Sequence, residues 1–328
     1  MLDTIRASAQ VEIVPWQAIS GWQYNKARDY KHKMVRLSNG ATIFLQYFFA
    51  SRSLTLFFSA SKVQHGSNAV PYDFSKANIV KEIIDKTVND ELYLDLTTDD
   101  FKVCRVDVNR DFSYNDERTA EAVMKFAKKI IPARCEKWCD YPTGFTSRTK
   151  RDGLRGYRKD KDPKMQGQLE KPTIRFEFQM SKKKIKKIVG FRPDLSTILT
   201  KEVLLIKAWN LLLKERGLDN PVSSQSELYR KSRKYLSNSL QTTLHQMNEN
   251  PSFSDKDQRT KQLAVIRKMK KARICPYSCE VPIDLTVNIC NTIMNNPKEG
   301  LLCSTPHTIC IHIPAEDAIS EKWYLDTS

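Results

Sequence analysis

A tyrosine stands inside a run of basic residues at 154–162, LRGYRKDKD. A phenol in such a place can pack in a core, stack on a nucleobase or attack a phosphorus atom. Two acidic residues, Asp107 and Glu177, flank it in the alternating stretches RVDVNRDF and IRFEFQM. Carboxylate oxygens are hard ligands that suit Mg²⁺ or Mn²⁺, and tyrosine forms covalent intermediates in enzymes. Together these residue types fit metal-assisted phosphoryl transfer.

The tyrosine would need help to react. A free tyrosine has a pKa of about 10 and is a weak nucleophile at neutral pH. Lys159, Arg155 or a bound metal ion would favour the phenolate of Tyr157 if they lay close to it. Attack on DNA would join one end of the strand to the tyrosine and release a hydroxyl on the other, so the bond energy is kept for later rejoining.

Three alternating segments, 103–112, 153–159 and 173–180, must position these residues. Because residues two apart on a strand share a face, each segment is predicted to bury one face and to present polar side chains on the other. An ordinary antiparallel sheet with a solvated face is the alternative interpretation. The polar faces would carry Arg105, Asp107, Asn109 and Asp111, then Arg155, Tyr157 and Lys159, then Thr173, Arg175, Glu177 and Gln179, and the opposite face of the first segment would carry Cys104, Val106, Val108 and Phe112.

The remaining pattern predicts both strands and helices. Strands are expected at 41–49 and 53–60. Helices are expected after Ser75, which would cap the first, and after Asp116, where Pro132 would help to end the second. Beyond Phe191 the character becomes helical, in the segments 197–218, 226–250 and 255–273.

The fold class that follows is α+β. Residues 1–195 are predicted to form a catalytic domain around a mainly antiparallel sheet with flanking helices. Residues 196–328 are predicted to form a mainly helical region for DNA binding or accessory contacts. Its basic stretches YRKSRKYL and RKMKKAR could read an origin duplex in the major groove, grip DNA without specificity, or contact a helicase.

Charge points to a polyanionic partner. Lys and Arg number 54 against 38 Asp and Glu, for a net charge of +16 and a pI near 9.4. Such an excess favours nucleic acid first and an anionic membrane surface second, although a basic soluble protein without such a partner has the same composition. No run approaches the roughly 20 apolar residues of a membrane helix. Asp3 and Arg6 stand where a secretory signal would be apolar, so we expect a cytosolic protein.

Two basic runs are predicted to contact DNA. Residues 147–161 hold seven cations against two acids, and binding through them should fall steeply with salt. The run KKKIKK at 182–187 is predicted to begin a helix that leans on the DNA backbone. A solvated surface is the alternative interpretation of both runs. The expected DNA contacts are Arg105, Arg148, Lys150, Arg151, Arg158, Lys161, Arg175, Lys182, Lys183 and Lys184.

Eight cysteines leave a second metal site open. In a cytosolic protein they are expected as thiols or metal ligands rather than disulfides. Cys135 and Cys139, and Cys275 and Cys279, have the spacing of zinc ligands. Scattered buried thiols are favoured over a zinc site because the later spacings are irregular. The downstream residues concerned are Cys290, Cys303, His307, Cys310 and His312.

The three polar motifs also resemble a known family. Arg105-Val106-Asp107-Val108, Arg155-Gly156-Tyr157-Arg158-Lys159 and Arg175-Phe176-Glu177-Phe178 resemble, in this order, motifs of rolling-circle replication initiators of the filamentous-phage gene II/X type and of related plasmid initiators. The stretch 59–70 is similar to the family's Lys-Val…Gly-x-Asn segment, and MLDTIR is similar to its start. The resemblance covers about residues 1–190. None of the five histidines forms the His-hydrophobe-His pair of a different rolling-circle class.

This resemblance implies a metal-dependent DNA nicking-closing endonuclease of phage or plasmid replication. It implies that Tyr157 cuts one strand at the origin, forming a 5′-phosphotyrosyl link and a free 3′-OH primer. Asp107 and Glu177 would bind Mg²⁺ or Mn²⁺, and Lys159 would assist at the phosphate. The implied partners are origin DNA, as duplex and nicked single strand, and a host helicase, in the cytoplasm of a bacterial host cell without a membrane partner. A non-catalytic DNA-binding regulator and an RNA-binding protein are the alternatives.

Overall fold

The computed structural model describes residues 2–129, 137–149, 152–165, 167, 169–216, 222–249, 256–281 and 283–285. Met1–Leu285 form one compact unit. Several residues to which the sequence assigned a role lie outside the described residues. These are the expected DNA contacts Lys150 and Arg151 and the metal-ligand candidates Cys135, Cys290, Cys303, His307, Cys310 and His312.

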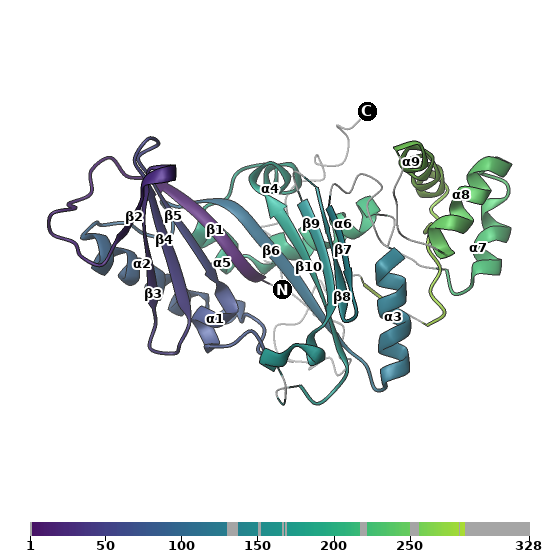
Figure 1. The fold of residues 1–328 in the computed structure, drawn as a ribbon, viewed down its shortest axis with the longest axis horizontal. Coiled ribbons are helices and arrows are strands. Elements are labelled where there is room, and N and C mark those ends of the chain that lie inside the picture. The colour runs from purple at the N-terminus through teal and green to yellow at the C-terminus, as the bar shows by residue number, and fades with distance from the viewer. Residues whose placement is uncertain are drawn as a thin grey trace, which may run out of the picture. The chain divides into compact units, whose positions relative to one another are not determined.

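One antiparallel sheet of ten strands organises the described part of the chain, in the order β2-β3-β4-β5-β1-β6-β10-β9-β8-β7. Together with its flanking helices, it confirms the predicted α+β class (Figure 1). The strands are β1 (Leu2–Gln10), β2 (Gln23–Asn25), β3 (Tyr30–Arg36), β4 (Thr42–Phe48), β5 (Ser53–Ser59), β6 (Lys102–Ser113), β7 (Lys137–Tyr141), β8 (Gly144–Arg148), β9 (Asp152–Arg158) and β10 (Thr173–Ser181).

The five strands expected from alternation, β4, β5, β6, β9 and β10, are confirmed to within one or two residues at each end. The other five were not predicted. Among them β1 matters most, because it pairs with both β5 and β6 and joins the two halves of the sheet. Its signal is present in the sequence: Ile5, Ala7 and Ala9 are buried and alternate with the polar Arg6 and Ser8.

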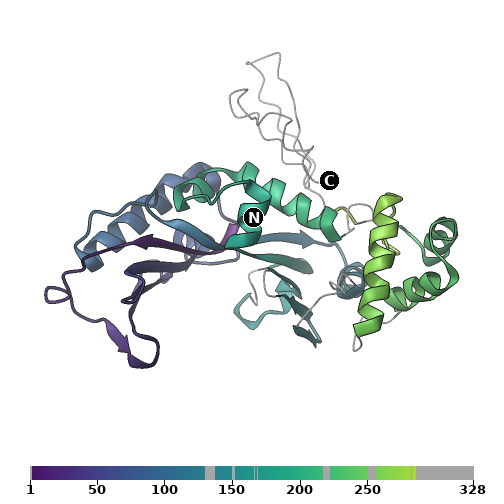
Figure 2. The same ribbon diagram turned by 90° about the horizontal axis from the view of Figure 1, so that it is seen from above.

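Helices cover one face of the sheet. In Figure 2, α2, α5 and α6 lie together on one side, which is the side behind the sheet in Figure 1. The indole of Trp209 on α6 makes an edge contact with Phe178 of β10, at 4.7 Å between ring centroids. The helices are α1 (Ala60–His65), α2 (Ala77–Leu92), α3 (Glu117–Lys129), α4 (Lys182–Val189), α5 (Leu195–Thr200), α6 (Glu202–Arg216), α7 (Gln225–Ser232), α8 (Asn238–Glu249) and α9 (Lys256–Lys271), with short 3-10 turns at Lys26–Arg28, Phe74–Lys76, Lys159–Lys161 and Pro163–Met165.

The predicted helix starts are partly right. Asp116 caps α3, since its carboxylate accepts from the backbone N–H of Thr119 at 2.8 Å. The prediction that Ser75 caps a helix is wrong. Asp73 is the cap, accepting from both the N–H and the hydroxyl of Ser75 in the 3-10 turn that precedes α2. Ser75 therefore lies inside the first turn as a donor to this cap, and α2 itself begins after Lys76 without a side-chain cap.

Two of the later helical segments are each divided. The segment 197–218 breaks at Lys201 into α5 and α6, and 226–250 breaks after Ser232 into α7 and α8. Helices α5 and α6 pack with the sheet-based part, although they follow the boundary predicted near residue 195. The division into domains at that boundary stays a prediction.

Candidate active site on the polar face of the sheet

The register of three neighbouring strands gathers most of the predicted site on one face. Strand β10 lies between β6 and β9, and directly paired residues share a face. Arg175 pairs with Asp111 on one side and Tyr157 on the other, and Glu177 pairs with Asn109 and Arg155. The side-chain alternation expected from the sequence therefore holds through the middle of all three strands.

Tyr157 and Glu177 are in direct contact. The phenol of Tyr157 donates a hydrogen bond of 2.8 Å to Glu177 Oε1. The guanidinium of Arg155 lies over the Tyr157 ring at 4.3 Å from its centroid, and its Nη1 is 3.7 Å from Glu177 Oε2. A nucleophile within hydrogen-bond reach of a base is the geometric signature of covalent catalysis.

The electrostatics of Tyr157 differ from the expectation. Burial and the negative charge of Glu177 raise the pKa of Tyr157 far above its usual 10. Arg175 and Arg155 act in the opposite direction but are outweighed. The expected phenolate is therefore not favoured in the free protein, because the nearest partner of the hydroxyl is a carboxylate and not a cation.

Two glycines make room for Tyr157. Gly144 pairs with it across β8 and β9, and a Cβ at Gly144 would lie 2.7 Å from Tyr157 Cβ. A Cβ at Gly156 would lie 2.5 Å from Cε1 of Phe145, whose side chain is fully buried. Both approaches are closer than real carbon contacts, so the strand pair can position the tyrosine in this way only with glycine at both places.

Asp107 lies on the same face, and its carboxylate is largely occupied. It pairs with Gln179, two residues along β10 from Glu177. Arg105 binds it with two hydrogen bonds, of 2.9 Å from Nε and 2.5 Å from Nη2. Burial is the main cause that raises the pKa of Asp107, with Arg105 opposing it.

A third carboxylate, which the sequence reasoning missed, acts on both acids. Asp3 on β1 is buried and accepts a hydrogen bond of 3.0 Å from the hydroxyl of Ser59. After burial itself, the negative charge of Asp3 is the leading cause that raises the pKa of Glu177, and it also raises that of Asp107. Only a prediction of β1 could have placed Asp3 here.

The residues fit a divalent cation that also binds substrate. The part of the chain that the structure describes contains no group of three His, Cys, Asp or Glu side chains placed to hold a metal. Mg²⁺, however, is often bound by one or two carboxylates together with substrate phosphates. Asp107 and Glu177 are diagonal neighbours on adjacent strands, and buried carboxylates with raised pKa values would be stabilised by a nearby positive charge. Arg105 would have to release Asp107.

Lys159 lies elsewhere than expected. Strand β9 ends at Arg158, and Lys159 begins a 3-10 turn. Its side chain is only 2% exposed, and its Nζ donates to Asp111 at 2.7 Å. Arg175 donates to the same carboxylate at 2.6 and 2.8 Å and is equally buried. Asp111 therefore ties two buried cations together, and neither of them presents its charge to solvent.

Arg158 points away from Tyr157 because neighbouring residues of a strand face opposite sides. It is buried and donates to Glu117 at 3.0 and 2.7 Å and to Asp160 at 2.9 and 2.6 Å. Lys161 is half exposed, with its Nζ 3.5 Å from Glu117. The two cations thus form one cluster with acidic residues beside α3, rather than a row of cations along the face of Tyr157.

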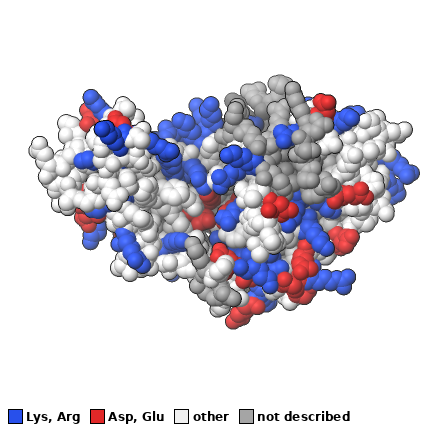
Figure 3. Space-filling view, in the orientation of Figure 1, with Lys and Arg blue, Asp and Glu red and all other residues white. Residues whose placement is uncertain are grey.

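Other expected DNA contacts are exposed. Figure 3 looks onto the polar face, where Lys and Arg side chains gather around α4 and acidic side chains lie near the middle of the sheet. Arg148, Lys182 and Lys183 are exposed, and the Arg105 side chain is 35% exposed. Lys184 is more enclosed, with its Nζ 3.7 Å from Asp152.

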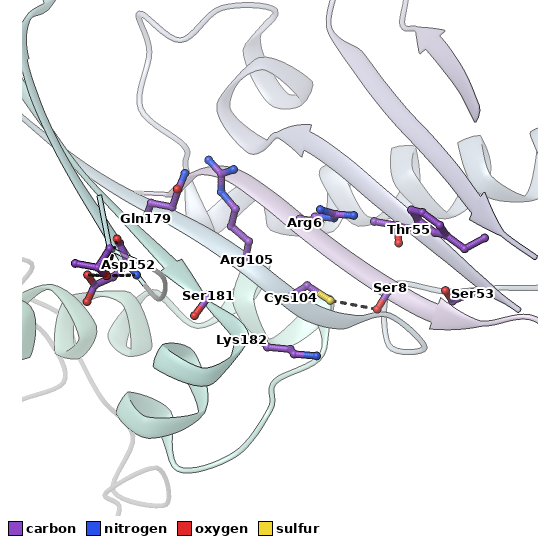
Figure 4. Close-up of a pocket in the computed structure, with 12 residues that line it drawn as sticks. Arg6, Ser8, Ser53, Thr55, Cys104, Arg105, Asp152, Gln179, Ser181 and Lys182 are labelled. Atoms are coloured by element: carbon purple, nitrogen blue, oxygen red, sulfur yellow. Dashed lines mark hydrogen bonds between the residues drawn. The ribbon is translucent and has the colours of Figure 1, made fainter. Parts of the chain in front are cut away.

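A hollow of about 430 Å³ lies on this face, and its lining includes Arg105 and Gln179, the two neighbours of Asp107 (Figure 4). Cys104 and Arg105 both line it, which corrects the prediction that they face opposite sides. The register between β1 and β6 shifts between Arg6 and Ala7, so that Arg6 pairs with Arg105 and Ala7 with Val103. This bulge leaves Cys104 without a direct partner and places it on the polar face, where its Sγ is 3.2 Å from the Ser8 hydroxyl.

The cysteines form no metal cluster among the described residues. Cys275 and Cys279 are buried and Cys139 is exposed, and none of the three is in a disulfide. Within the same part of the chain, no helix is long and apolar enough to cross a bilayer.

Comparisons with known proteins add little. No known family matches the chain, and no curated protein sequence does. A similar solved structure is a rolling circle replication initiator protein from Geobacillus stearothermophilus, with 12% identity over 62% of this chain and 79% of that one, at a TM-score of 0.30. A similarity this distant carries no argument about activity.

Proposed function

We propose that this protein nicks and rejoins single strands of DNA as an initiator of rolling-circle replication of a phage or plasmid. The observation that carries the proposal is the hydrogen bond from the Tyr157 phenol to Glu177. It places a nucleophile and a proton acceptor together, both half-buried, on a polar sheet face beside the exposed Arg155. The three sequence motifs support the same activity, because they occur in the order of the family that they resemble and each lies on a strand except for Lys159.

In the cleavage step, the phenol oxygen of Tyr157 attacks the phosphorus, and its proton passes to Glu177 Oε1. The bond from phosphorus to the 3′ oxygen breaks, and the released oxygen takes a proton from solvent. The product is a 5′-phosphotyrosyl strand end and a free 3′-OH. Rejoining is the reverse, with the 3′ oxygen attacking the phosphotyrosine. Because the raised pKa keeps the phenol protonated until attack, proton transfer to Glu177 is part of the reaction itself.

The surrounding residues hold this geometry. Arg155 covers the tyrosine ring and faces the second oxygen of Glu177, so it fixes the ring and lies close enough to neutralise a phosphate. Asp107 and Glu177 would hold Mg²⁺ or Mn²⁺. Such an ion would polarise a phosphate oxygen and screen the charge that develops in the transition state. Origin DNA and a host helicase are the proposed partners.

Covalent trapping tests the nucleophile. Wild-type protein incubated with Mg²⁺ and supercoiled origin DNA is expected to give nicked circles and, after nuclease digestion, a nucleotide adduct on Tyr157 detected by mass spectrometry. Tyr157→Phe is expected to give neither. Tyr93→Phe is the control, because that side chain is 66% exposed and lies at the end of α2. Full nicking by Tyr157→Phe would remove this residue from the mechanism.

A second experiment tests the metal. Asp107→Asn is expected to abolish Mg²⁺- or Mn²⁺-dependent nicking while leaving salt-sensitive DNA binding intact. Asp95→Asn, at an exposed position, is the control. Cleavage by Asp107→Asn at the wild-type rate, with the same dependence on metal concentration, would exclude the assignment.

A non-catalytic DNA-binding regulator of replication is the second candidate. The observation in its favour is the double hydrogen bond from Arg105 to Asp107, which already neutralises one proposed metal ligand. A regulator would bind origin DNA tightly and yield no nicked product with any divalent metal, which the trapping experiment reveals directly.

A further inference from the structure

We propose that the open face of β3, β4 and β5 is a stacking platform for single-stranded DNA, and that it leads into the polar hollow lined by Gln179, the strand partner of Asp107. The inference deepens the proposed function, on which it rests for the identity of the strand, because it assigns the surface that holds DNA beside the cut. The platform is defined by Tyr30, His32, Phe44, Phe48 and Phe57, five rings on the face of the sheet that also carries Arg6.

The rings lie on one face by register. Tyr30 pairs directly with Phe48 across β3 and β4, and Phe44 pairs with Phe57 across β4 and β5. His32 is two residues from Tyr30 on β3 and therefore lies on the same face. Its ring is 5.7 Å from that of Phe44. Tyr30 is 5.3 Å from Phe48 and 5.5 Å from His32. Aromatic residues on a sheet exposed to solvent give a surface on which unpaired bases can stack.

Phe57 joins this platform to the charged part of the face. It is 38% exposed and pairs with Arg6 of β1. The guanidinium of Arg105 lies 5.9 Å from the centroid of its ring. Packing in the core does not explain why this large apolar ring is exposed to solvent between two arginines. A base stacked on it would have a cation on either side for its phosphates.

The hollow continues the same path. Phe48, Ser53 and Thr55 line one side of it, and Arg6, Arg105 and Lys182 supply positive charge (Figure 4). The side chain of Arg6 has no ion-pair or hydrogen-bond partner in the part of the chain that the structure describes. Rings followed by cations match the alternation of bases and phosphates along a single strand, and only unpaired bases can stack in this way. Stacking rings and positive charge together thus point to a single-stranded nucleic acid, and the proposed function makes that strand DNA.

Fluorescence anisotropy with a labelled oligothymidylate tests the platform without metal and without cleavage. Phe57→Ala is expected to raise Kd at least about fivefold, because loss of one stacked base weakens binding by this much or more. Ile79→Ala is the matched control, since Ile79 is also exposed but lies on α2, on the other side of the sheet. Arg6→Gln is expected to raise Kd and to lower the salt dependence, whereas Lys86→Gln on α2 should change neither.

Photo-crosslinking gives a second readout. A bromodeoxyuridine oligonucleotide is expected to crosslink to the peptide that contains Phe57 or Phe48, and a duplex of the same sequence should not. Unchanged Kd in Phe57→Ala and Arg6→Gln, or crosslinks confined to other segments, would overturn the platform even if the protein nicks DNA. Stronger binding of oligouridylate would assign the face to RNA and would also overturn it. Loss of binding in both variants without any nicking would sustain the platform and reject the proposed function instead.

Discussion

The phenol oxygen of Tyr157 lies 2.8 Å from Oε1 of Glu177, across the paired strands β9 and β10. Burial raises the pKa of both groups, and the charge of Glu177 raises that of Tyr157 further. The hydrogen bond from Tyr157 opposes the rise at Glu177 without cancelling it. The proton between them is therefore held on the phenol at rest. A carboxylate with a raised pKa is also a stronger proton acceptor, which suits a general base.

Glu177→Gln is expected to lower the rate of nicking by about 10²-fold or more, the usual contribution of a general base. Glutamine keeps the shape and can still accept from Tyr157, but it cannot take the proton. Single-turnover cleavage kinetics measure the loss, with oligonucleotide affinity as the control. A rate within a factor of about two of wild type would contradict both proposed roles of Glu177, as the base and as a metal ligand.

The same substitution is expected to stabilise the fold at pH 8. The pKa of Glu177 is raised in the folded state, so its ionised form opposes folding above that pKa and the penalty disappears as pH falls. Urea denaturation at pH 8 should show a higher free energy of unfolding for Glu177→Gln than for wild type. The difference should shrink toward pH 4. Lower stability of the variant at pH 8 would contradict the electrostatic account.

Asp111→Asn is expected to destabilise the protein by about 3–5 kcal/mol at pH 7, because it leaves the buried Lys159 and Arg175 without their carboxylate. Burial opposes the ionisation of Asp111, but hydrogen bonds and charges from Arg175 and Lys159 outweigh it and lower its pKa. The stabilisation is therefore present near neutral pH and is lost as pH falls through the lowered pKa. Chemical denaturation from pH 7 to pH 3 checks this, with Asp95→Asn as the exposed control.

Gly156→Ala is expected to cost about 1–3 kcal/mol of stability and to slow nicking, because the added methyl would collide with the buried ring of Phe145. The neighbouring Tyr157 would be displaced from Glu177. Combining the change with Phe145→Leu should recover part of both losses, since leucine leaves space where the ring edge was. Strictly additive losses in the double variant would show that the two side chains do not compete for the same volume.

Lys182→Gln and Lys183→Gln are each expected to weaken DNA binding by a similar factor for every sequence. Each should also reduce the slope of log K against log salt by about 1, as for a single phosphate contact. Both lysines are exposed on the first turn of α4. Binding measured between 50 and 200 mM salt on duplex and single strands provides the slope. Lys86→Gln on α2 is the control, and a slope equal to wild type in both variants would place DNA elsewhere.

The sequence by itself determined the local pattern of the site. Strict alternation in β6, β9 and β10 was enough to predict which face carries Asp107, Tyr157 and Glu177, because side chains on a strand have a period of two. It also predicted the α+β class and the helix that Asp116 begins. Alternation fails only where the backbone departs from a regular strand: at the bulge that turns Cys104 to the polar face, and after Arg158, where β9 ends.

Tertiary structure alone decided which charges are available. The resemblance implied Lys159 at the phosphate, and Arg175 was expected among the DNA contacts, yet both are bound to Asp111 in the interior. Asp3 entered the site from β1, some hundred positions earlier in the chain than Asp107. Partners so distant in sequence are chosen by strand order and register, which are long-range properties. For the same reason, no local pattern could show that Tyr157 would meet a carboxylate rather than a cation.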